Sequence, residues 1–460
     1  MGVVRNLGDL LDPSKSCTKC IKARETALKL VDVGIESANP YSAVARYISV
    51  RSDGRVDIGG KVYDVRRVFV VGFGKAAYSM ARAVEDKLSD MIDSGVISVP
   101  HTIADRCKLR RIKVIGSGHP LPNENSIRAA CEILDLVSEA REGDLVIVLI
   151  SGGGSALFEK PVDNVSLNDM IETTKLLLKC GATINEINTV RKHLSLVKGG
   201  KLAKYAYPAR VVSLIISDVV GDDLSTIASG PTAPDNTTFH DAYNVLVKYG
   251  IWDKLPESVR EYISRGLKGL EEETVKPGDP VFTKVRNIIV ASNIDSLVKM
   301  RFEAEKMGYN AVIVTSMIQG EAREVGKVIA SIALEVKRSN MPIPKPAVLL
   351  FGGETTVTVR GSGVGGRNQE LALSASTLIT GEHGVAVVSV GSDGIDGVTD
   401  VAGGIVDAHS LERAEKAGLK VDEILGNNDS YRFFKTLGDY VYTGPTGTNV
   451  NDLIVVVVEK

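Results

Sequence analysis

Short apolar runs that end near glycine recur along this chain, and most are followed by the apolar spacing of an amphipathic helix. Val68–Gly72 precedes the helical stretch 76–88, and the run 144–150 leads into Gly152. This alternation predicts an α/β protein with mostly parallel sheets. Ligands of open parallel sheets bind beyond the carboxyl ends of the strands, where these glycines fall. We therefore expect a binding site at those strand ends.

The same pattern divides the chain into two series of elements. The first series predicts a hairpin at 56–65, strands at 68–72, 95–98, 112–115, 144–150 and 211–216, and helices at 21–49, 76–88, 125–140 and 166–179. The second series predicts strands at 286–291, 310–315, 347–351, 355–360, 384–390 and 453–458, and helices at 294–307 and 322–338. No internal repeat relates the two series.

The composition changes between the two series, after Pro231–Asp235. Two helical stretches, near 237–250 and 256–268, lead to the polar segment 269–280, which is typical of a linker or hinge. We predict a Rossmann-like α/β domain over 1–236, a helical connector and hinge over 237–280, and a smaller α/β domain over 281–460. The ligand is expected in the cleft between the two domains.

Charge and composition exclude several classes of protein. Lys and Arg number 55 against 57 Asp and Glu, so the chain has no global positive field to attract nucleic acid. With 44% hydrophobic residues and a net charge of -2, disorder is excluded as the main state. The chain has no run of 18 apolar residues, so we predict no membrane span. The first residues lack the apolar core of a signal peptide. Five cysteines do not make a disulfide framework, so we expect a reducing, cytoplasmic setting.

Two of the cysteines, Cys17 and Cys20, form a single Cys-x-x-Cys. A zinc site would need two more ligands at a matching spacing, and no second pair follows. Ordinary helical spacing explains the motif better.

The turn Gly72-Phe-Gly74-Lys75 is the first candidate for chemistry. A helix is predicted to begin at once, so backbone N–H groups and the helix dipole would face an anion. The turn also matches the dinucleotide fingerprint G-x-G-x-x-A, but the next strand, 95–101, lacks the acid that would bind a ribose. Lys75 therefore matters most, as a point charge at an anion-binding turn.

A second glycine-rich turn and a basic segment follow in the same domain. The turn comprises Ser151, Gly152, Gly153, Gly154 and Ser155, and it could form a nest of N–H groups for phosphate or carboxylate. The segment 188–203 carries basic residues that suggest anionic substrate groups, with a merely solvated basic face as the rival interpretation. These residues are Arg191, Lys192, Lys198 and Lys201.

Carboxylates follow the predicted strand 211–216. Asp218 ends the apolar run, and Asp222 follows Gly221. Mg²⁺ binds one or two carboxylates together with water and phosphate oxygens. We therefore predict Asp218 and Asp222 as metal ligands, with Asp218 also serving catalysis.

The second domain has a comparable set of polar residues. Glu354 follows a double glycine, and the loop GSGVGG delivers Arg367 to a predicted helix start, which suggests another anion site. Asp393 and Asp396 follow the strand near 384–390. The segment 442–453 is a hydroxyl-rich turn before the final strand. His119 and His193 lack the order of a Ser-His-Asp triad, so hydrogen-bonded structural roles are expected for both.

Taken together, the motifs resemble those of the glycerate kinases with a C-terminal MOFRL domain. The segments GFGKAA, SGGGSA, NTVRKHLSLVKGGKLA, SDVVGDDLSTIASGPT, GGETTVTV, GGRNQELAL, GSDGIDG and TGPTGTNVND occur in the family's order. The resemblance covers the chain from about residue 20 onwards and places the MOFRL region at about 346–455. It implies two α/β domains with the active site in the cleft between them.

The resemblance also implies a reaction. Family members phosphorylate D-glycerate with ATP and a divalent metal such as Mg²⁺, typically to 2-phosphoglycerate in archaeal members. Lys75 and Arg367 match the likeliest essential residues, and no nucleic-acid or membrane partner is implied. The oligomeric state, a homodimer included, stays open. The chain departs from the family at Asn123, where Asp is expected, and in the segment GVTDVAGG.

Two rival functions remain. An NAD(P)-dependent hydroxypyruvate reductase would explain the G-x-G-x-x-A match. A non-enzymatic sensor of sugar acids is disfavoured because no basic recognition module is evident.

Overall fold

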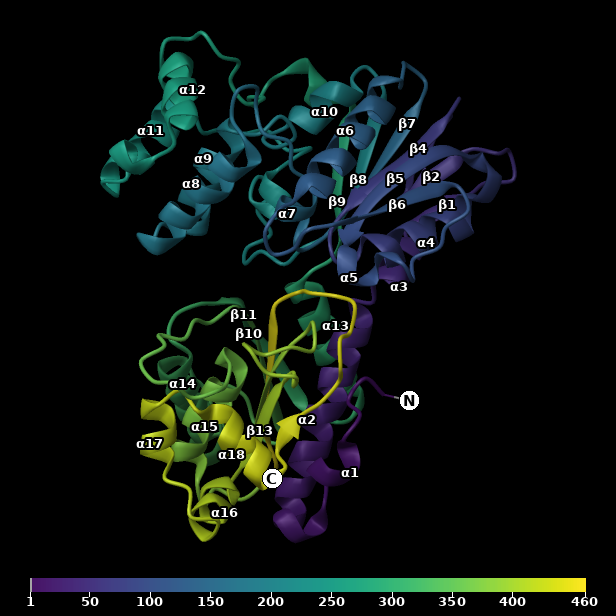
Figure 1. Cartoon of the computed structure of the whole chain (residues 1–460). Helices are drawn as coiled ribbons and strands as arrows, with labels where there is room; N and C mark the ends of the chain where they lie inside the picture. Colours follow the sequence, from purple (N-terminus) through teal and green to yellow (C-terminus); the bar gives the residue numbers. More distant parts are fainter. Residues whose placement is uncertain (1) are drawn as a thin grey trace. The chain divides into compact units, whose positions relative to one another are not determined.

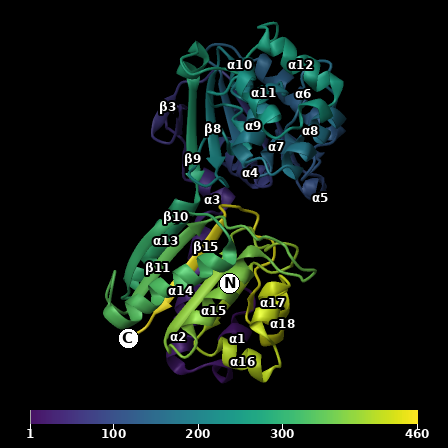
Figure 2. The same cartoon turned by 90° about the vertical axis from the view of Figure 1, so that its left-hand side faces the viewer.

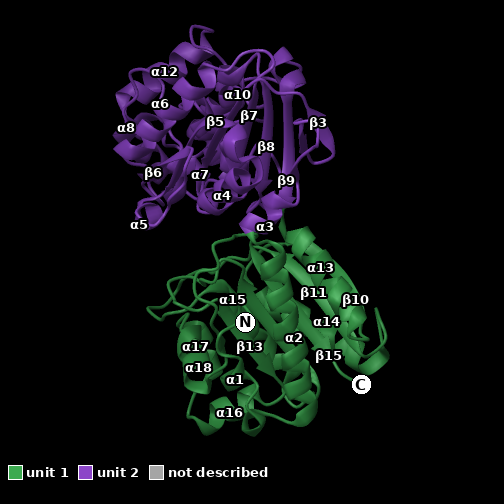
Figure 3. Cartoon of the chain, turned by 90° about the vertical axis from the view of Figure 1, so that its right-hand side faces the viewer, with its two compact units in different colours: residues 1–39, 291–460 green, residues 40–290 purple. Residues whose placement is uncertain are grey.

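A computed structural model describes residues 2–460, and the chain forms two compact units (Figure 3). One unit comprises residues 40–290 and is called here the parallel-sheet unit. The other combines residues 1–39 with 291–460 and is called the mixed-sheet unit. These units differ from the predicted domains, because the first 39 residues join the C-terminal half. Nor is the segment 237–280 a separate connector, since it lies wholly within the parallel-sheet unit.

The parallel-sheet unit contains a six-stranded sheet with the order β6-β5-β4-β7-β8-β9. Pairing from β6 through β8 is parallel, as predicted, so the carboxyl ends of these strands share one edge. Every residue of β4 and β7 is buried, which explains their continuous apolar runs. The strands are β4 (Val68–Phe73), β5 (Ile92–Pro100), β6 (Ile112–Ser117), β7 (Leu145–Ile150), β8 (Arg210–Ile216) and β9 (Val285–Ala291).

The sequence pattern predicts that the second series of elements begins with a strand at residue 286. Strand β9 contradicts this prediction. It is hydrogen-bonded to β8 and completes the first sheet. A separate antiparallel sheet confirms the predicted hairpin, with Ile58 opposite Lys61 across the Gly59-Gly60 turn. It consists of β1 (Ile48–Val50), β2 (Val56–Ile58) and β3 (Lys61–Tyr63).

Two groups of helices in this unit belong to separate cores (Figure 1). Side chains of α6 and α10 pack with Phe69, Val71 and Phe73 of β4, while α8, α9, α11 and α12 share a core of their own. The helices are α3 (Pro40–Ala45), α4 (Ala77–Leu88), α5 (His101–Ala104), α6 (Glu124–Ser138), α7 (Gly154–Leu157), α8 (Leu167–Lys179), α9 (Ile184–His193), α10 (Lys201–Ala206), α11 (Phe239–Lys248) and α12 (Glu257–Leu267).

The mixed-sheet unit corrects the prediction of mostly parallel sheets. Its sheet has the order β10-β11-β15-β12-β13-β14, and the pair β10 and β11 is parallel whereas the other pairs are antiparallel. The predicted strand 355–360 contributes a single bridge, Glu321 to Thr356. The strands are β10 (Asn310–Ile318), β11 (Ala347–Gly353), β12 (Val385–Gly391), β13 (Gly403–Asp407), β14 (Tyr440–Val441) and β15 (Asp452–Val458).

Helices flank the mixed sheet (Figure 2), and alternate residues of β11 pack against two different helical layers. Val348 and Leu350 pack with α2 and α13, whereas Leu349 and Phe351 pack with α14, α15 and α18. The helices are α1 (Leu7–Leu10), α2 (Thr18–Ser37), α13 (Asn293–Lys306), α14 (Ala322–Ser339), α15 (Arg367–Ile379), α16 (Ser410–Lys416), α17 (Val421–Gly426) and α18 (Ser430–Leu437).

A buried ion-pair network explains why the N-terminal helix belongs to this unit. Arg24 of α2 is fully buried, contacts Asp407 and bonds Asp439 at 3.0 Å. A buried guanidinium requires carboxylate partners, and these come from β13 and from the segment before β14. The predicted single helix 21–49 is therefore two helices, α2 and α3, which lie in different units. Among the described residues, no helix is long and apolar enough to cross a membrane.

Candidate active site

Two glycine-rich turns interlock where β4 and β7 end. The backbone N–H of Lys75 donates to the Gly152 carbonyl at 2.9 Å, and the N–H of Ala76 donates to Ser151 Oγ at 3.1 Å. Gly74 has φ +130°, and a Cβ there would lie 2.2 Å from Ser151 Oγ. Glycine is therefore required at position 74 for the turns to approach so closely.

Lys75 and His119 lie on either side of the second turn. A Cβ on Gly153 would lie 3.4 Å from Lys75 Cγ and 2.9 Å from His119 Cδ2. The Lys75 side chain is exposed, while burial and the charge of Lys75 lower the pKa of His119. An imidazole in this position is neutral at pH 7 and lies beside a cation. The structure thus brings His119, for which a purely structural role was predicted, to the edge where Lys75 stands.

Asn123 fixes the loop that carries His119. Its Oδ1 accepts from Ser126 N at 3.1 Å as the N-cap of α6, and from Gly118 N at 2.9 Å. An asparagine oxygen serves both bonds as an aspartate oxygen would. The departure from the family pattern at this position therefore leaves the loop anchored.

Asp218 reaches the same place from β8. A Cβ on Gly152 would lie 2.3 Å from Asp218 Oδ2, so the carboxylate lies directly against the turn. Asp222 follows in a turn with φ +57°. The structure thus brings together residues from the ends of β4, β6, β7 and β8, as expected for a parallel sheet. We call Lys75, His119, residues 151–155 and Asp218 the strand-end centre.

Arg191 and Lys198 support this centre from inside the protein. Both donate to the Ser155 carbonyl at 3.0 Å, and Lys198 also donates to Phe158 O at 2.9 Å and pairs with Glu159 at 3.2 Å. The Lys198 side chain is fully buried, and burial lowers its pKa to about 8. The sequence predicts that Lys198 contacts substrate. In the structure its bonds instead hold the end of α7, so Lys198 has a structural role.

The remaining basic residues of this segment are also buried. Lys192 pairs with Asp235 at 3.2 Å, and Lys201 donates to Ser195 O at 2.7 Å. A solvated basic face is therefore wrong for Lys192, Lys198 and Lys201. The two ring nitrogens of His193 lie 2.8 Å from Thr189 O and 3.0 Å from Glu273 Oε2, which confirms the predicted structural role of that histidine.

Backbone strain accompanies the strand-end centre. Ala228, Ser229 and Gly230 have φ of 49°, 63° and 63°, and the first two are not glycine. Ser229 Oγ lies 2.9 Å from Ser155 Oγ, and a Cβ on Gly154 would lie 2.9 Å from Ala228 Cβ. Such strain persists where surrounding structure enforces it, often at functional sites. The sequence pattern gave no sign of this contribution.

A second group of charged residues lies at one edge of the mixed sheet. Because β15 runs antiparallel between β11 and β12, its first residue, Asp452, pairs with Gly353 and with Gly391. Glu354 and Asp393 follow those two strands, so three carboxylates reach the same edge. We call Glu354, Arg367, Asp393, Asp396 and Asp452 the carboxylate centre.

Arg367 is held by two of these carboxylates. Its Nε and Nη2 donate to Asp452 at 2.7 and 3.0 Å, and its Nη1 lies 2.9 Å from Glu354 Oε1. Burial opposes the charge, yet Asp452 and Glu354 raise the pKa of Arg367 above its ordinary value. Burial raises the pKa of Glu354. The guanidinium is therefore neutralised within the protein, and the surplus charge of this centre is negative.

Asp396 caps helix α15, which corrects the prediction of an anion site there. Its carboxylate accepts from the N–H groups of Asn368 and Gln369 at 3.0 and 2.9 Å. Gly366 permits the approach, since a Cβ there would lie 2.2 Å from the carboxyl carbon. Burial raises the pKa of Asp396 to about 6. The N–H groups at this helix start are thus already bonded, and Asp396 does not face a substrate.

Asp452 and Asn368 are the main residues that the sequence analysis missed. Asn368 Nδ2 donates to Asp452 Oδ1 at 2.9 Å, which fixes the carboxylate that holds Arg367. The available signal was an aspartate at the start of the apolar run 453–458. It was missed because acidic residues were sought only after strands, as in a parallel sheet.

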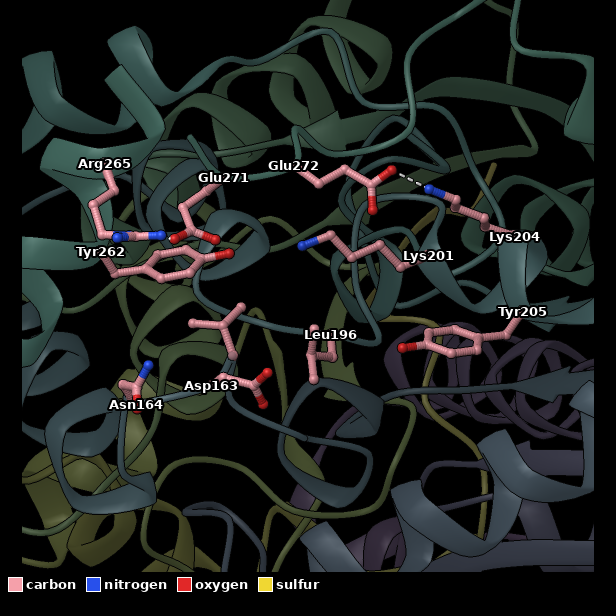
Figure 4. Close-up of a pocket in the computed structure, with 11 residues that line it drawn as sticks. Asp163, Asn164, Leu196, Lys201, Lys204, Tyr205, Tyr262, Arg265, Glu271 and Glu272 are labelled. Carbon is pink, nitrogen blue, oxygen red and sulfur yellow. Dashed lines mark hydrogen bonds and ion pairs between the residues drawn. The ribbon is translucent and has the colours of Figure 1, made fainter. Parts of the chain in front are cut away.

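A cavity of about 670 Å³ lies elsewhere in the parallel-sheet unit (Figure 4). Its charged side chains are largely paired, with Lys204 contacting Glu272 and Arg265 bonding Glu271 at 2.5 Å. From the predicted basic segment only Leu196 and Lys201 line it, and its lining includes no glycine. This cavity therefore lies apart from the strand-end centre.

Comparison with known proteins decides the family. Residues 26–264 match a domain of unknown function (DUF4147), and residues 347–452 match the MOFRL family. The chain is 48% identical over 437 residues to glycerate 2-kinase of Pyrococcus horikoshii, covering 95% of this chain and 97% of that protein. It is 43% identical to D-glycerate 2-kinase of Thermotoga maritima, covering 94% and 97%.

The chain belongs to the glycerate kinase family. The solved structure of the Thermotoga maritima glycerate kinase agrees with this fold, with a TM-score of 0.84 and 42% identity over 94% of this chain and 99% of that one. The family's motifs coincide with the two centres. The glycine-rich turns and Asp218 fall in the DUF4147 match, whereas Glu354, Arg367 and Asp452 fall in the MOFRL match.

Proposed function

We propose that this protein transfers the γ-phosphoryl group of ATP to the 2-hydroxyl of D-glycerate, giving 2-phosphoglycerate, with the help of a divalent metal ion. The observation that carries the proposal is the strand-end centre. It combines an exposed lysine, a glycine-rich turn and a carboxylate at the carboxyl edge of a parallel sheet. Phosphoryl transfer depends mainly on positioning and charge neutralisation, which these groups provide.

Lys75 is the principal catalytic residue in this proposal. Its backbone is fixed to Gly152, while its exposed side chain is open to a phosphate oxygen. The ammonium group gains most as charge redistributes over the phosphoryl oxygens in the transition state. Neutral His119 adds a polar group without repelling Lys75.

Mg²⁺, or a similar divalent cation, fits the oxygen donors at the end of β8. Asp218 lies against the glycine turn and Asp222 follows in the next turn, and Mg²⁺ takes one or two protein carboxylates. When bound, the ion would neutralise phosphate charge. Asp218, which lies against Gly152, would hold the ion beside the glycine-rich turn.

Arg367 is proposed to bind the carboxylate of D-glycerate. Asp452 is buried and holds the guanidinium through two bonds, whereas Glu354 is half-exposed and makes one. A substrate carboxylate can therefore replace Glu354 at Nη1 while Asp452 keeps the fork oriented. Buried Lys192, Lys198 and Asp396 position these groups and do not contact substrate.

Product analysis tests the proposal directly. The purified protein with ATP, Mg²⁺ and D-glycerate should give the phosphorus NMR signal of authentic 2-phosphoglycerate. EDTA should abolish it. The signal of 3-phosphoglycerate would correct the position of transfer. The absence of any phosphorylated glycerate would refute the kinase activity.

Hydroxypyruvate reduction is the second candidate, because a relative from Agrobacterium vitis, 42% identical over 435 residues, is provisionally named a hydroxypyruvate reductase. The structure offers it little support. Strand β5 ends in Ser98-Val99-Pro100, so no acid stands where the ribose of NAD would need one. Oxidation of NADH with hydroxypyruvate, measured by absorbance beside the kinase assay, separates the two functions.

A further inference from the structure

Two cysteines and two histidines from distant parts of the chain meet in the mixed-sheet unit. Cys17, Cys20, His383 and His409 each offer a ligand atom, and these atoms all lie within 4.8 Å of one another. Across residues 2–460, no other group of three or more His, Cys, Asp or Glu side chains meets the same condition. We propose that these four side chains bind one zinc ion.

The two sulfur atoms are arranged by the start of helix α2. Cys17 is the N-cap and Cys20 stands in the first turn, so both thiols face the same side, with the sulfurs 3.1 Å apart. A disulfide would need about 2.05 Å. Two thiolates on tetrahedral zinc, each about 2.3 Å from the metal, stand roughly 3.8 Å apart. A small rotation of one side chain therefore brings the pair to zinc geometry.

His409 is arranged as a metal-binding histidine. Its Nδ1 lies 3.4 Å from Glu412 Oε2, and its Nε2 is buried without a hydrogen-bond partner among residues 2–460. A carboxylate on one ring nitrogen fixes the tautomer and leaves the other nitrogen for the metal. A buried nitrogen without a partner costs free energy unless something binds it. Zinc supplies that partner.

His383 completes the set from the turn before β12. Its ring centroid lies 4.8 Å from that of His409, and the residue is exposed, which leaves a route for the ion. The next residue, Gly384, donates its N–H to Cys20 Sγ at 3.2 Å. Such an outer hydrogen bond orients a ligating sulfur.

The donor set identifies the metal and separates this site from the kinase chemistry. Two sulfurs and two imidazole nitrogens suit tetrahedral zinc, whereas Mg²⁺ prefers oxygen donors such as those of Asp218. The site would connect α2 to the turn before β12 and to the start of α16. These elements are far apart in sequence, so the ion would serve to hold the N-terminal helix in its unit.

Metal analysis of the whole chain tests the site. The reduced protein is loaded with one equivalent of zinc, passed over a chelating resin and analysed by mass spectrometry of the metal. The wild type should retain about one zinc per chain, and Cys17→Ser and His383→Ala should each lose most of it. Cys107→Ser is the matched control, because Cys107 is a half-buried free thiol of the other unit. It should retain the ion.

Cobalt gives a second readout that the oxygen-based metal site cannot mimic. Co²⁺ should produce a thiolate charge-transfer band in the wild type and in Cys107→Ser, and the band should be lost in His383→Ala and Cys17→Ser. Since His383 is exposed, its alanine variant should fold even if a cysteine variant does not. Zinc-free wild type, equal retention by the variants, or a Cys17–Cys20 disulfide formed in the presence of zinc would overturn the proposal.

Discussion

The strand-end centre and the carboxylate centre both occupy a sheet edge, yet they treat charge in opposite ways. In the parallel-sheet unit, Lys75 is exposed while Lys192 and Lys198 are buried in ion pairs. In the mixed-sheet unit, the guanidinium of Arg367 is already matched by Asp452 and Glu354. The strand-end centre therefore has a cation that a ligand can contact directly, whereas the cation of the carboxylate centre is already paired with carboxylates. A sequence shows that a charge is present but not whether it is available.

Removal of Lys75 should have the largest effect. We expect Lys75→Ala to lower kcat by about 10²–10³, as loss of a transition-state charge contact does. Steady-state assay of ATP-dependent phosphorylation of D-glycerate measures it. Lys87→Ala, an exposed lysine on α4, is the control and should keep its rate. A folded Lys75→Ala enzyme with normal kcat and KM would remove the strand-end centre from the mechanism.

Loss of Arg367 tests whether the two centres serve one step. Arg367→Ala should lower kcat strongly, and it should also destabilise the unit because it leaves buried Asp452 without its cationic partner. The Lys75→Ala, Arg367→Ala double variant should lose less than the product of the two single effects. Arg367→Lys should restore only part of the rate, since it lacks the fork. Strictly multiplicative losses would mean that the centres act independently.

Replacement of Glu354 should have a smaller effect, and it should improve substrate binding where the two preceding variants impair the enzyme. If substrate displaces Glu354 from Arg367, Glu354→Gln removes a competitor worth roughly 0.5 kcal/mol for a half-exposed pair. The KM for D-glycerate should then fall about two-fold while kcat changes little. Glu423→Gln, at an exposed position of the same unit, is the control. A raised KM would mean that Glu354 itself contacts the substrate.

The last effect concerns stability and its dependence on pH, and not the rate of the reaction. The folded pKa of Asp396 is about 6, above the ordinary 3.8, so the folded state binds the proton more tightly than the unfolded state. Asp396 should therefore make the protein less stable as pH rises from about 4 to 6, by up to ~3 kcal/mol. Melting temperatures of wild type and Asp396→Asn across this range measure the difference. Parallel curves would show that Asp396 does not titrate in the folded protein.

The local pattern predicted the first sheet well. Runs such as 68–72 and 144–150 became β4 and β7, and the glycines after them form the strand-end centre because parallel strands end at one edge. Periodicity carries this information, since fully buried strands read as continuous apolar runs.

The mixed sheet was harder to predict, because an apolar run carries no direction. The run 453–458 reads the same whether it pairs parallel or antiparallel, and only its position between β11 and β12 brings Asp452 to Arg367. The convergence of Cys20 with His383 and His409 depends equally on long-range packing. A spacing rule for two Cys-x-x-Cys pairs could not find histidines contributed by separate turns.

Above all, we propose that the phosphates of ATP bind at the strand-end centre. A crystal structure with a non-hydrolysable ATP analogue, Mg²⁺ and D-glycerate tests it most directly. We predict phosphate oxygens on the backbone of Gly152 and Gly153 and on Lys75 Nζ, with the metal on Asp218. Phosphates seated instead among Glu354, Asp393 and Asp452, with Lys75 still directed to solvent, would contradict the account.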